Sequence, residues 1–159
     1  MLRMDITTSL DFAADPAAVF TTLTDQKYLE EVCVASESIS YAVSVSGSST
    51  HTSRTLRAPD SVARFTGDQL TVIEDVTWGD ASAGGARLAD LTMTILGQPV
   101  KLTGTQQLAP GGRGTLVDLR GELKVAIPLL GRKLEQSAAP AVLAGFETQQ
   151  KVGDAWLAR

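Results

Sequence analysis

The residues with the clearest chemical potential are polar side chains set among apolar ones along expected β-strands. In the stretch LTVIEDVTWG, strand alternation places Glu74 on a face whose other members are leucine, valine and tryptophan. An isolated, ionised carboxylate in an apolar interior costs several kcal/mol, so Glu74 must reach water, take up a proton or pair with a cation. Strand phase puts the strongly basic Arg54 on the same face. Arg54 is therefore the predicted partner of Glu74, with the Tyr41 hydroxyl as the alternative.

Two further polar residues fall on strand faces that are otherwise apolar. Thr52 is in phase with Arg54, and Gln106 lies in the alternating stretch VKLTGTQQL. Polar groups at one end of a pocket would orient an amphipathic ligand. In an enzyme, Glu74 would instead act as general acid or base while Arg54 or Tyr41 polarises a carbonyl group. For Arg54 and Gln106, a position near a strand end where the side chain simply reaches water is an equal alternative.

His51 is the only histidine and Cys33 the only cysteine in the sequence. A lone histidine argues against a multi-histidine metal site and a Ser-His-Asp triad, and a lone cysteine excludes an internal disulfide. His51 is out of phase with the apolar face of its strand, which predicts a surface position. Cys33 has helical core spacing and no evident base partner, which predicts a structural thiol. We expect no metal and no cofactor.

The elements that position these residues begin with a strand and two short helices. Residues 4–12 alternate as a half-buried strand. Asp15 and Pro16 then predict the start of a helix, because Asp caps well and Pro fits the first helical position. Thr24 or Asp25 predicts the start of a second short helix. The predicted buried side of this second helix consists of Leu29, Val32 and Cys33.

The rest of the chain predicts a meander of strands followed by one long helix. Residues 39–127 alternate through Gly- and Ser-rich turns and predict six further strands, with residues 59–67 as a longer connection. Residues 128–159 predict a helix about 45 Å long, opened by Pro128 and kinked at Pro140. Such an order predicts an α+β fold, in which a seven-stranded, curved antiparallel sheet wraps around the C-terminal helix.

The predicted buried stripe of the long helix is bulky at its ends and small in its middle. Bulk comes from Leu130, Leu134, Val152 and Trp156, and the small residues are Ser137, Ala138, Ala141 and Gly145. Opposite a concave sheet, small residues favour a hollow, the usual form of a binding pocket. Tight packing of Ala and Gly against the sheet is the alternative.

Composition limits the function classes. At 159 residues, the chain is expected to form a single domain over residues 1–159. A net charge of −4 and the absence of a basic run argue against nucleic acid as a partner. The N-terminus alternates and does not resemble a signal peptide, and no apolar run approaches the ~20 residues of a membrane span. We therefore expect a cytoplasmic protein without integral membrane association.

The order of elements, with DPAAVFTTLTD after the first strand and IPLLGRKLE…AWL at the end, resembles the helix-grip fold. This is the START-like superfamily, which includes polyketide cyclases and birch-pollen-allergen-like proteins. Within it, the chain looks most like a small, functionally uncharacterised family typical of actinobacteria. The resemblance implies a cavity between sheet and helix that holds an apolar or amphipathic small molecule, without implying one chemistry. The metal ligands of the ring-hydroxylating members have no counterpart in this sequence.

These observations predict binding of a small hydrophobic or amphipathic ligand, for transport or sequestration, in that cavity. The predicted ligand-binding residues are Tyr41, Thr52, Arg54, Glu74, Val76, Leu91, Met93, Gln106, Leu119, Ala141 and Gly145. One alternative is an enzyme of the cyclase or dehydratase type that uses Glu74, Arg54 and Tyr41. A second alternative is a protein-interaction module whose groove accepts an apolar segment.

Overall fold

The fold is a seven-stranded antiparallel sheet with a long helix across its concave face, seen in a computed structural model that describes residues 4–159. The strands are β1 (Met4–Phe12), β2 (Ser40–Ser46), β3 (Ser49–Arg57), β4 (Gln69–Trp78), β5 (Arg87–Ile95), β6 (Val100–Gly111) and β7 (Gly114–Val125). The helices are α1 (Pro16–Leu23), α2 (Gln26–Ala35), α3 (Asp60–Thr66) and α4 (Gly131–Leu157). The predicted fold class is confirmed, and the longer connection predicted over residues 59–67 contains the additional helix α3.

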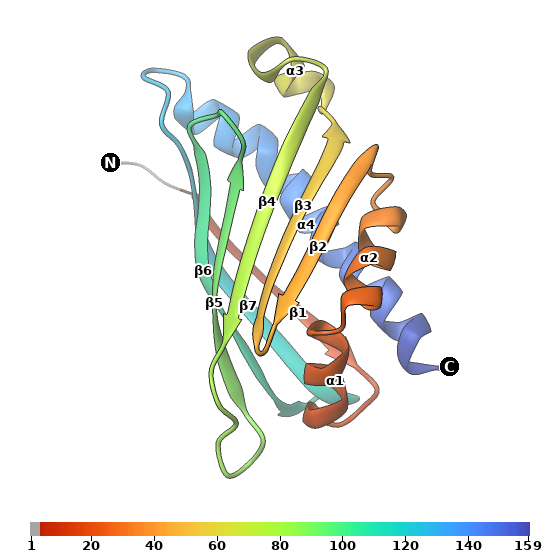
Figure 1. The fold of residues 1–159 in the computed structure, drawn as a ribbon. Coiled ribbons are helices and arrows are strands. Elements are labelled where there is room, and N and C mark those ends of the chain that lie inside the picture. The colour runs from red at the N-terminus through yellow and green to blue at the C-terminus, as the bar shows by residue number, and fades with distance from the viewer. Residues whose placement is uncertain (1–3) are drawn as a thin grey trace.

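Strands β2 to β7 pair in sequence order, with α3 in the connection between β3 and β4, and β1 pairs with β7, giving the order β1-β7-β6-β5-β4-β3-β2. In Figure 1, α4 runs diagonally across one face of the sheet, α1 and α2 lie at one side, and α3 lies at the opposite end. α4 packs against β1, β7 and α2, while α2 also packs against the edge strand β2. Helices thus cover the concave face of the sheet, and the opposite face is exposed to solvent.

The two short helices begin where the sequence predicts. Asp15 caps α1 by accepting a hydrogen bond from the Ala18 N–H at 2.8 Å, and Pro16 is the first residue of the helix. Asp25 caps α2 by accepting from two N–H groups of its first turn, at 2.8 and 3.2 Å. Each cap satisfies N–H groups that have no partner within the helix.

Strand register determines which side chains share the concave face. The Cα partners align Thr52 with Glu74, Glu74 with Met93, and then Met93 with Leu102 and Leu102 with Leu123. Residues directly opposite each other in an antiparallel pair point to the same side of the sheet. These five residues therefore form a row across five strands on the side that α4 covers.

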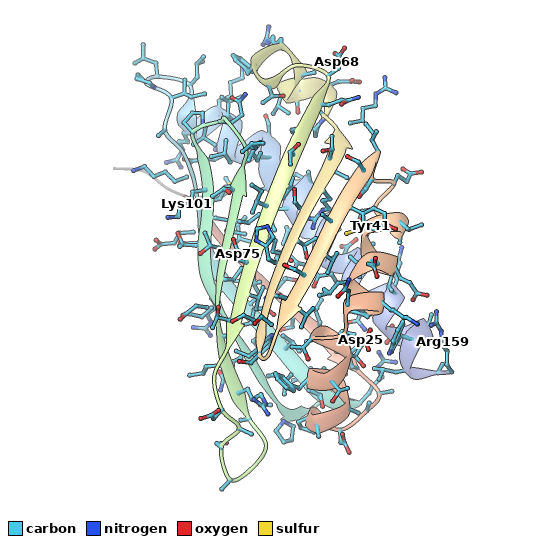
Figure 2. The ribbon with its side chains drawn as sticks, viewed as in Figure 1. Asp25, Tyr41, Asp68, Asp75, Lys101 and Arg159 are labelled. Atoms are coloured by element: carbon cyan, nitrogen blue, oxygen red, sulfur yellow. The ribbon has the colours of Figure 1, made fainter. Side chains whose placement is uncertain are left out.

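The opposite face of the sheet is polar and exposed. His51 and Asp75 are register partners on β3 and β4, and His51 Nδ1 lies 2.5 Å from Asp75 Oδ1. Figure 2 shows Asp75 on the side of the sheet turned away from α4. Both side chains are about half exposed, so His51 has the surface position that the strand phase predicts.

The long helix differs from the prediction at its start and in its buried stripe. It begins at Gly131, not Pro128, because Leu129 takes a positive φ of 69°, which is incompatible with a right-handed helix. Leu130 and Ala141, both predicted to be buried, are exposed. The buried residues of α4 are Gly131, Leu134, Glu135, Phe146 and Gly153. The prediction missed this stripe because it includes glycines and a carboxylate, which carry no hydropathy signal.

Candidate ligand-binding site

A cavity of about 310 Å³ lies between the concave face of the sheet and α4. Pockets that bind small molecules usually measure about 300–1,000 Å³. At about 30 Å³ for each water-sized group, this cavity has room for a ligand of about ten non-hydrogen atoms. Its apolar walls include Val72, Met93, Leu102, Leu123 and Phe146.

The cavity reaches the surface near α3. Exposed residues that line this end are Glu37, Arg57, Pro59, Phe65, Pro99 and Ala141. α3 contains no buried residue, yet Val62, Phe65 and Thr66 contribute to the cavity wall. Figure 1 shows α3 at the end of the sheet opposite α1, so the mouth and the packed end of the fold lie far apart.

The inner part of the cavity carries two buried charged residues, Arg54 from β3 and Glu74 from β4. Their exposed fractions are 8% and 7%. Arg54 Nε and Glu74 Oε1 are both buried without a hydrogen-bond partner. Within residues 4–159, the ion pairs present do not include one between Arg54 and Glu74. The predicted direct pairing of Glu74 with Arg54 or Tyr41 is therefore not formed, although the two charges are close enough to interact electrostatically.

Burial dominates the electrostatics of Glu74. Loss of solvation raises the pKa of its carboxyl group above the ordinary value, and the negative charge of Asp75 raises it further. The Arg54 guanidinium opposes this rise in pKa without cancelling it. The protonated form of Glu74 is consequently favoured to a higher pH than for a glutamate in water.

α2 supplies two neutral groups to the same region, Tyr28 and Cys33. The Tyr28 hydroxyl donates a hydrogen bond to the Gln149 carbonyl oxygen at 2.8 Å, which ties α2 to α4. Burial raises the pKa of Tyr28, and the nearby Glu74 charge adds to that rise. Burial also raises the pKa of the Cys33 thiol, against the effect of Arg54. Both groups are therefore uncharged at neutral pH, and neither places a further charge beside Arg54 and Glu74.

Not all of the predicted site residues lie together. Those that line the cavity are Arg54, Glu74, Met93, Ala141 and Gly145. Those that do not line it are Tyr41, Thr52, Val76, Leu91, Gln106 and Leu119. Tyr41 is 41% exposed on the edge strand β2, beside α2 (Figure 2).

The separation has a simple structural cause. Val76, Leu91 and Leu119 share the concave face with the cavity residues, but they belong to the hydrophobic core cluster. That cluster also contains side chains from α1 and α2, which fill this end of the concave face. Periodicity in the sequence identifies which side chains share a face of the sheet. It does not show at which position along the strand that face borders a cavity.

Sequence reasoning also missed lining residues outside the main strands. They come from α3, from the β5–β6 turn, from the segment before α4 and from α4 itself, and they include Val62, Phe65, Gln98, Ile127, Val142 and Phe146. The spacing of Val62 and Phe65 is a helical i,i+3 pair, which could have identified the inner side of α3. Tyr28, which does not line the cavity but is influenced by the Glu74 charge, was also not predicted; it lies four residues before Val32 on the buried side of α2.

Residues 4–159 lack the features of two other kinds of site. None of the helices there combines the length and the apolar character that crossing a membrane requires. No three or more His, Cys, Asp or Glu side chains in this part of the chain come together in a way that could hold a metal ion. The cavity, with its buried Arg54 and Glu74 side chains, is the strongest candidate for a functional site.

The family model of DUF2505, described as "Protein of unknown function", matches residues 7–157. The chain belongs to the DUF2505 family. No curated protein sequence matches this DUF2505 chain significantly.

Solved structures share the architecture of this DUF2505 protein. TTHA0849 from Thermus thermophilus is 20% identical, with a TM-score of 0.63 over 97% of this chain and 98% of that one. Ms6760 from Mycobacterium smegmatis is 16% identical, with a TM-score of 0.60 over 97% and 90%. Ara h 8.0201 is 13% identical, with a TM-score of 0.57 over 94% and 97%. At these identities the likeness shows the fold, and it is the helix-grip fold.

Proposed function

We propose that this DUF2505 protein binds a small hydrophobic or amphipathic molecule in the cavity between the sheet and α4. The observation that carries the proposal is the cavity of about 310 Å³, with largely apolar walls and a mouth at α3. Protein interiors are normally packed as densely as organic crystals, so an unfilled apolar volume of this size forgoes dispersion contacts. A bound ligand would restore those contacts. Transport or sequestration in the cytoplasm is the setting that we propose for this binding.

The test uses a neutral, apolar fluorescent probe and two phenylalanine substitutions on α4. Ala138 is half-buried and lines the cavity, so the ring of Ala138→Phe should occupy the ligand volume. Ala144 is exposed on the same helix and does not line the cavity, which makes Ala144→Phe the matched control. We expect the native protein and Ala144→Phe to bind about one probe per chain, and Ala138→Phe to bind it at least about tenfold more weakly.

Thermal melts of the same variants separate blocking of the cavity from unfolding. Ala138→Phe should retain its melting temperature, because the ring enters unfilled space. If it unfolds, Val142→Phe, at a second half-buried lining position, serves as the blocking variant. Probe binding that is absent from the native protein, or equal in all variants, would contradict the proposal.

An enzyme of the cyclase or dehydratase type is the second candidate, and one observation favours it. Glu74 faces the cavity, and burial raises the pKa of its carboxyl group toward the range of a general acid. Arg54 would polarise a carbonyl group of the substrate, whereas Tyr41 lies too far toward the edge of the sheet to line the cavity. Mass spectrometry of small molecules recovered after incubation with cell extract distinguishes the candidates. A carrier returns its ligand unchanged, and an enzyme returns a product of altered mass.

A further inference from the structure

Arg54 presents a buried positive charge for which the protein provides no contacting counterion among residues 4–159. Its side chain is 8% exposed, and its Nε has no hydrogen-bond acceptor. A guanidinium group stays protonated in proteins, so it cannot avoid this cost by losing its proton. Glu74 is the nearby carboxylate, but its Oε1 is equally unpaired and the two residues form no ion pair. The inner end of the cavity therefore has hydrogen-bonding capacity that no described protein group uses.

The helix leaves space beside this guanidinium. A Cβ atom placed on Gly145 would lie 3.8 Å from Arg54 Nη2, with no closer neighbour. α4 thus approaches Arg54 at a residue that has no side chain. From this point the apolar wall continues past Leu56 and Leu70 toward α3.

We infer that the ligand is an amphipathic monocarboxylate whose carboxylate group binds Arg54, whose apolar chain extends toward α3, and whose binding adds a proton to Glu74. The inference rests on the proposed function and specifies its ligand class. A carboxylate matches the planar fork of a guanidinium group and can accept two parallel hydrogen bonds from it. A phosphate group fits less well, because it would bring about two negative charges to a site with one cation and one carboxylate.

The proton on Glu74 follows from the charges that face the site. α2 presents Tyr28 and Cys33, both neutral, and α4 presents Gly145 and Gln149, which carry no charge. β5 contributes the apolar Met93, and the remaining charged lining residues, Glu37 and Arg57, lie at the exposed mouth.

A ligand carboxylate and an ionised Glu74 would therefore share a single inner cation. Two carboxylates in one buried site cannot both stay ionised at low cost, so one of them holds a proton. Glu74 takes this proton from solvent, because burial already raises the pKa of its carboxyl group. The neutral acid can then donate a hydrogen bond to the ligand carboxylate, and the net charge of the filled site is zero.

This coupling fixes the sign of the pH dependence. Binding that takes up one proton weakens as the pH rises above the pKa of Glu74 in the free protein, by at most about tenfold per pH unit. Glu74→Gln imitates the protonated carboxyl group in shape and in lack of charge. Its affinity for the carboxylate should not change with pH above the ligand's own pKa.

The experiment compares decanoate with 1-decanol, a neutral molecule of the same chain length, by isothermal titration calorimetry on the full chain between about pH 6 and pH 8. Repeating the titration in two buffers of different ionisation enthalpy measures the protons taken up. We expect decanoate to bind at least about tenfold more tightly than decanol, and Arg54→Gln to lose about thirtyfold or more of the decanoate affinity. Binding of decanol should be unaffected by Arg54→Gln. Arg132→Gln, an exposed position of α4 outside the cavity, controls for general loss of positive charge.

The outcomes separate this inference from the proposed function. Equal binding of decanoate and decanol, an unchanged decanoate affinity in Arg54→Gln, or binding without proton uptake would each overturn the inference. If the neutral probe binds but neither decanoate nor decanol does, the inference fails and the proposed function stands. If the probe does not bind either, both fail.

Discussion

Two glycines of α4 give opposite expectations for the same substitution. A Cβ on Gly145 would meet Arg54 Nη2 at 3.8 Å, an ordinary contact, whereas a Cβ on Gly153 would lie 2.4 Å from Cε1 of Phe12. Phe12 is 1% exposed and belongs to the core cluster, so its ring has little room to move. In a helix interior, alanine is favoured over glycine by about 1 kcal/mol. Gly145→Ala should therefore raise the free energy of unfolding by about 0.5–1 kcal/mol.

Gly153→Ala gains the same helix propensity but incurs an overpacking cost of about 1–3 kcal/mol. Because the propensity gain is common to both variants, the difference between their free energies of unfolding measures the overpacking at Gly153 alone. Equilibrium urea unfolding, followed by tryptophan fluorescence, gives both values if the m-value stays constant. Equal stabilities would refute the packing of α4 on Phe12. A loss of more than about 1 kcal/mol in Gly145→Ala would refute the open space beside Arg54.

Glu74→Gln should remove a pH-dependent loss of stability. Burial raises the folded-state pKa of Glu74, so its stabilising contribution is complete below the unfolded-state pKa and is lost as the pH rises through the folded-state pKa. The free energy of unfolding should fall by at most about 1.4 kcal/mol per pH unit in this window. Urea unfolding should show this slope in the native chain and not in the variant. Glu135→Ala should cost about 1–3 kcal/mol, because the buried Val125 N–H loses its 2.9 Å hydrogen bond to Oε2, and an unchanged urea midpoint would contradict this. Asp25→Ala should cost about 1 kcal/mol and lower the melting temperature by about 2–4 °C, because α2 loses its N-cap. An unchanged melting temperature would count against this.

The order of elements was predictable because each element carries a local signal. The caps at Asp15 and Asp25 depend on side chains within three residues of the N–H groups that they satisfy. Strand alternation likewise depends only on which residues are buried on one face. These signals identified the helix-grip fold, whereas the narrower placement in an actinobacterial group stays a prediction.

The buried stripe of α4 was harder to predict because its burial depends on distant partners. Glu135 is buried because its Oε2 accepts a hydrogen bond from the Val125 N–H at the end of β7. Gly153 is buried since the Phe12 ring lies against the helix backbone. Neither residue has a hydrophobic side chain, so helical periodicity assigned the stripe to positions such as Ala141. Only the packing of α4 on β1 and β7 fixes its rotation.

The cavity position shows the same limit in the sheet. Glu74 and Gln106 are both buried polar residues on the concave face, and the sequence treats them alike. The structure separates them, because α1 and α2 fill one end of that face while α3 only covers the other end. The length of the connections and the tilt of the helices decide which end stays hollow, and neither can be read from alternation.

The unpaired state of Arg54 and Glu74 has a consequence for how the site would work. A direct ion pair would satisfy the donors of the guanidinium group, and a ligand carboxylate would then have to break that pair before binding. Keeping the charges apart leaves the donors of Arg54 available and raises the proton affinity of Glu74. The cost of two buried, unpaired groups is offset by the well-packed end of the fold, where side chains such as Phe12 and Tyr28 are almost fully buried. Stability at one end of the concave face thereby permits a ligand-selective polar end in the cavity at the other.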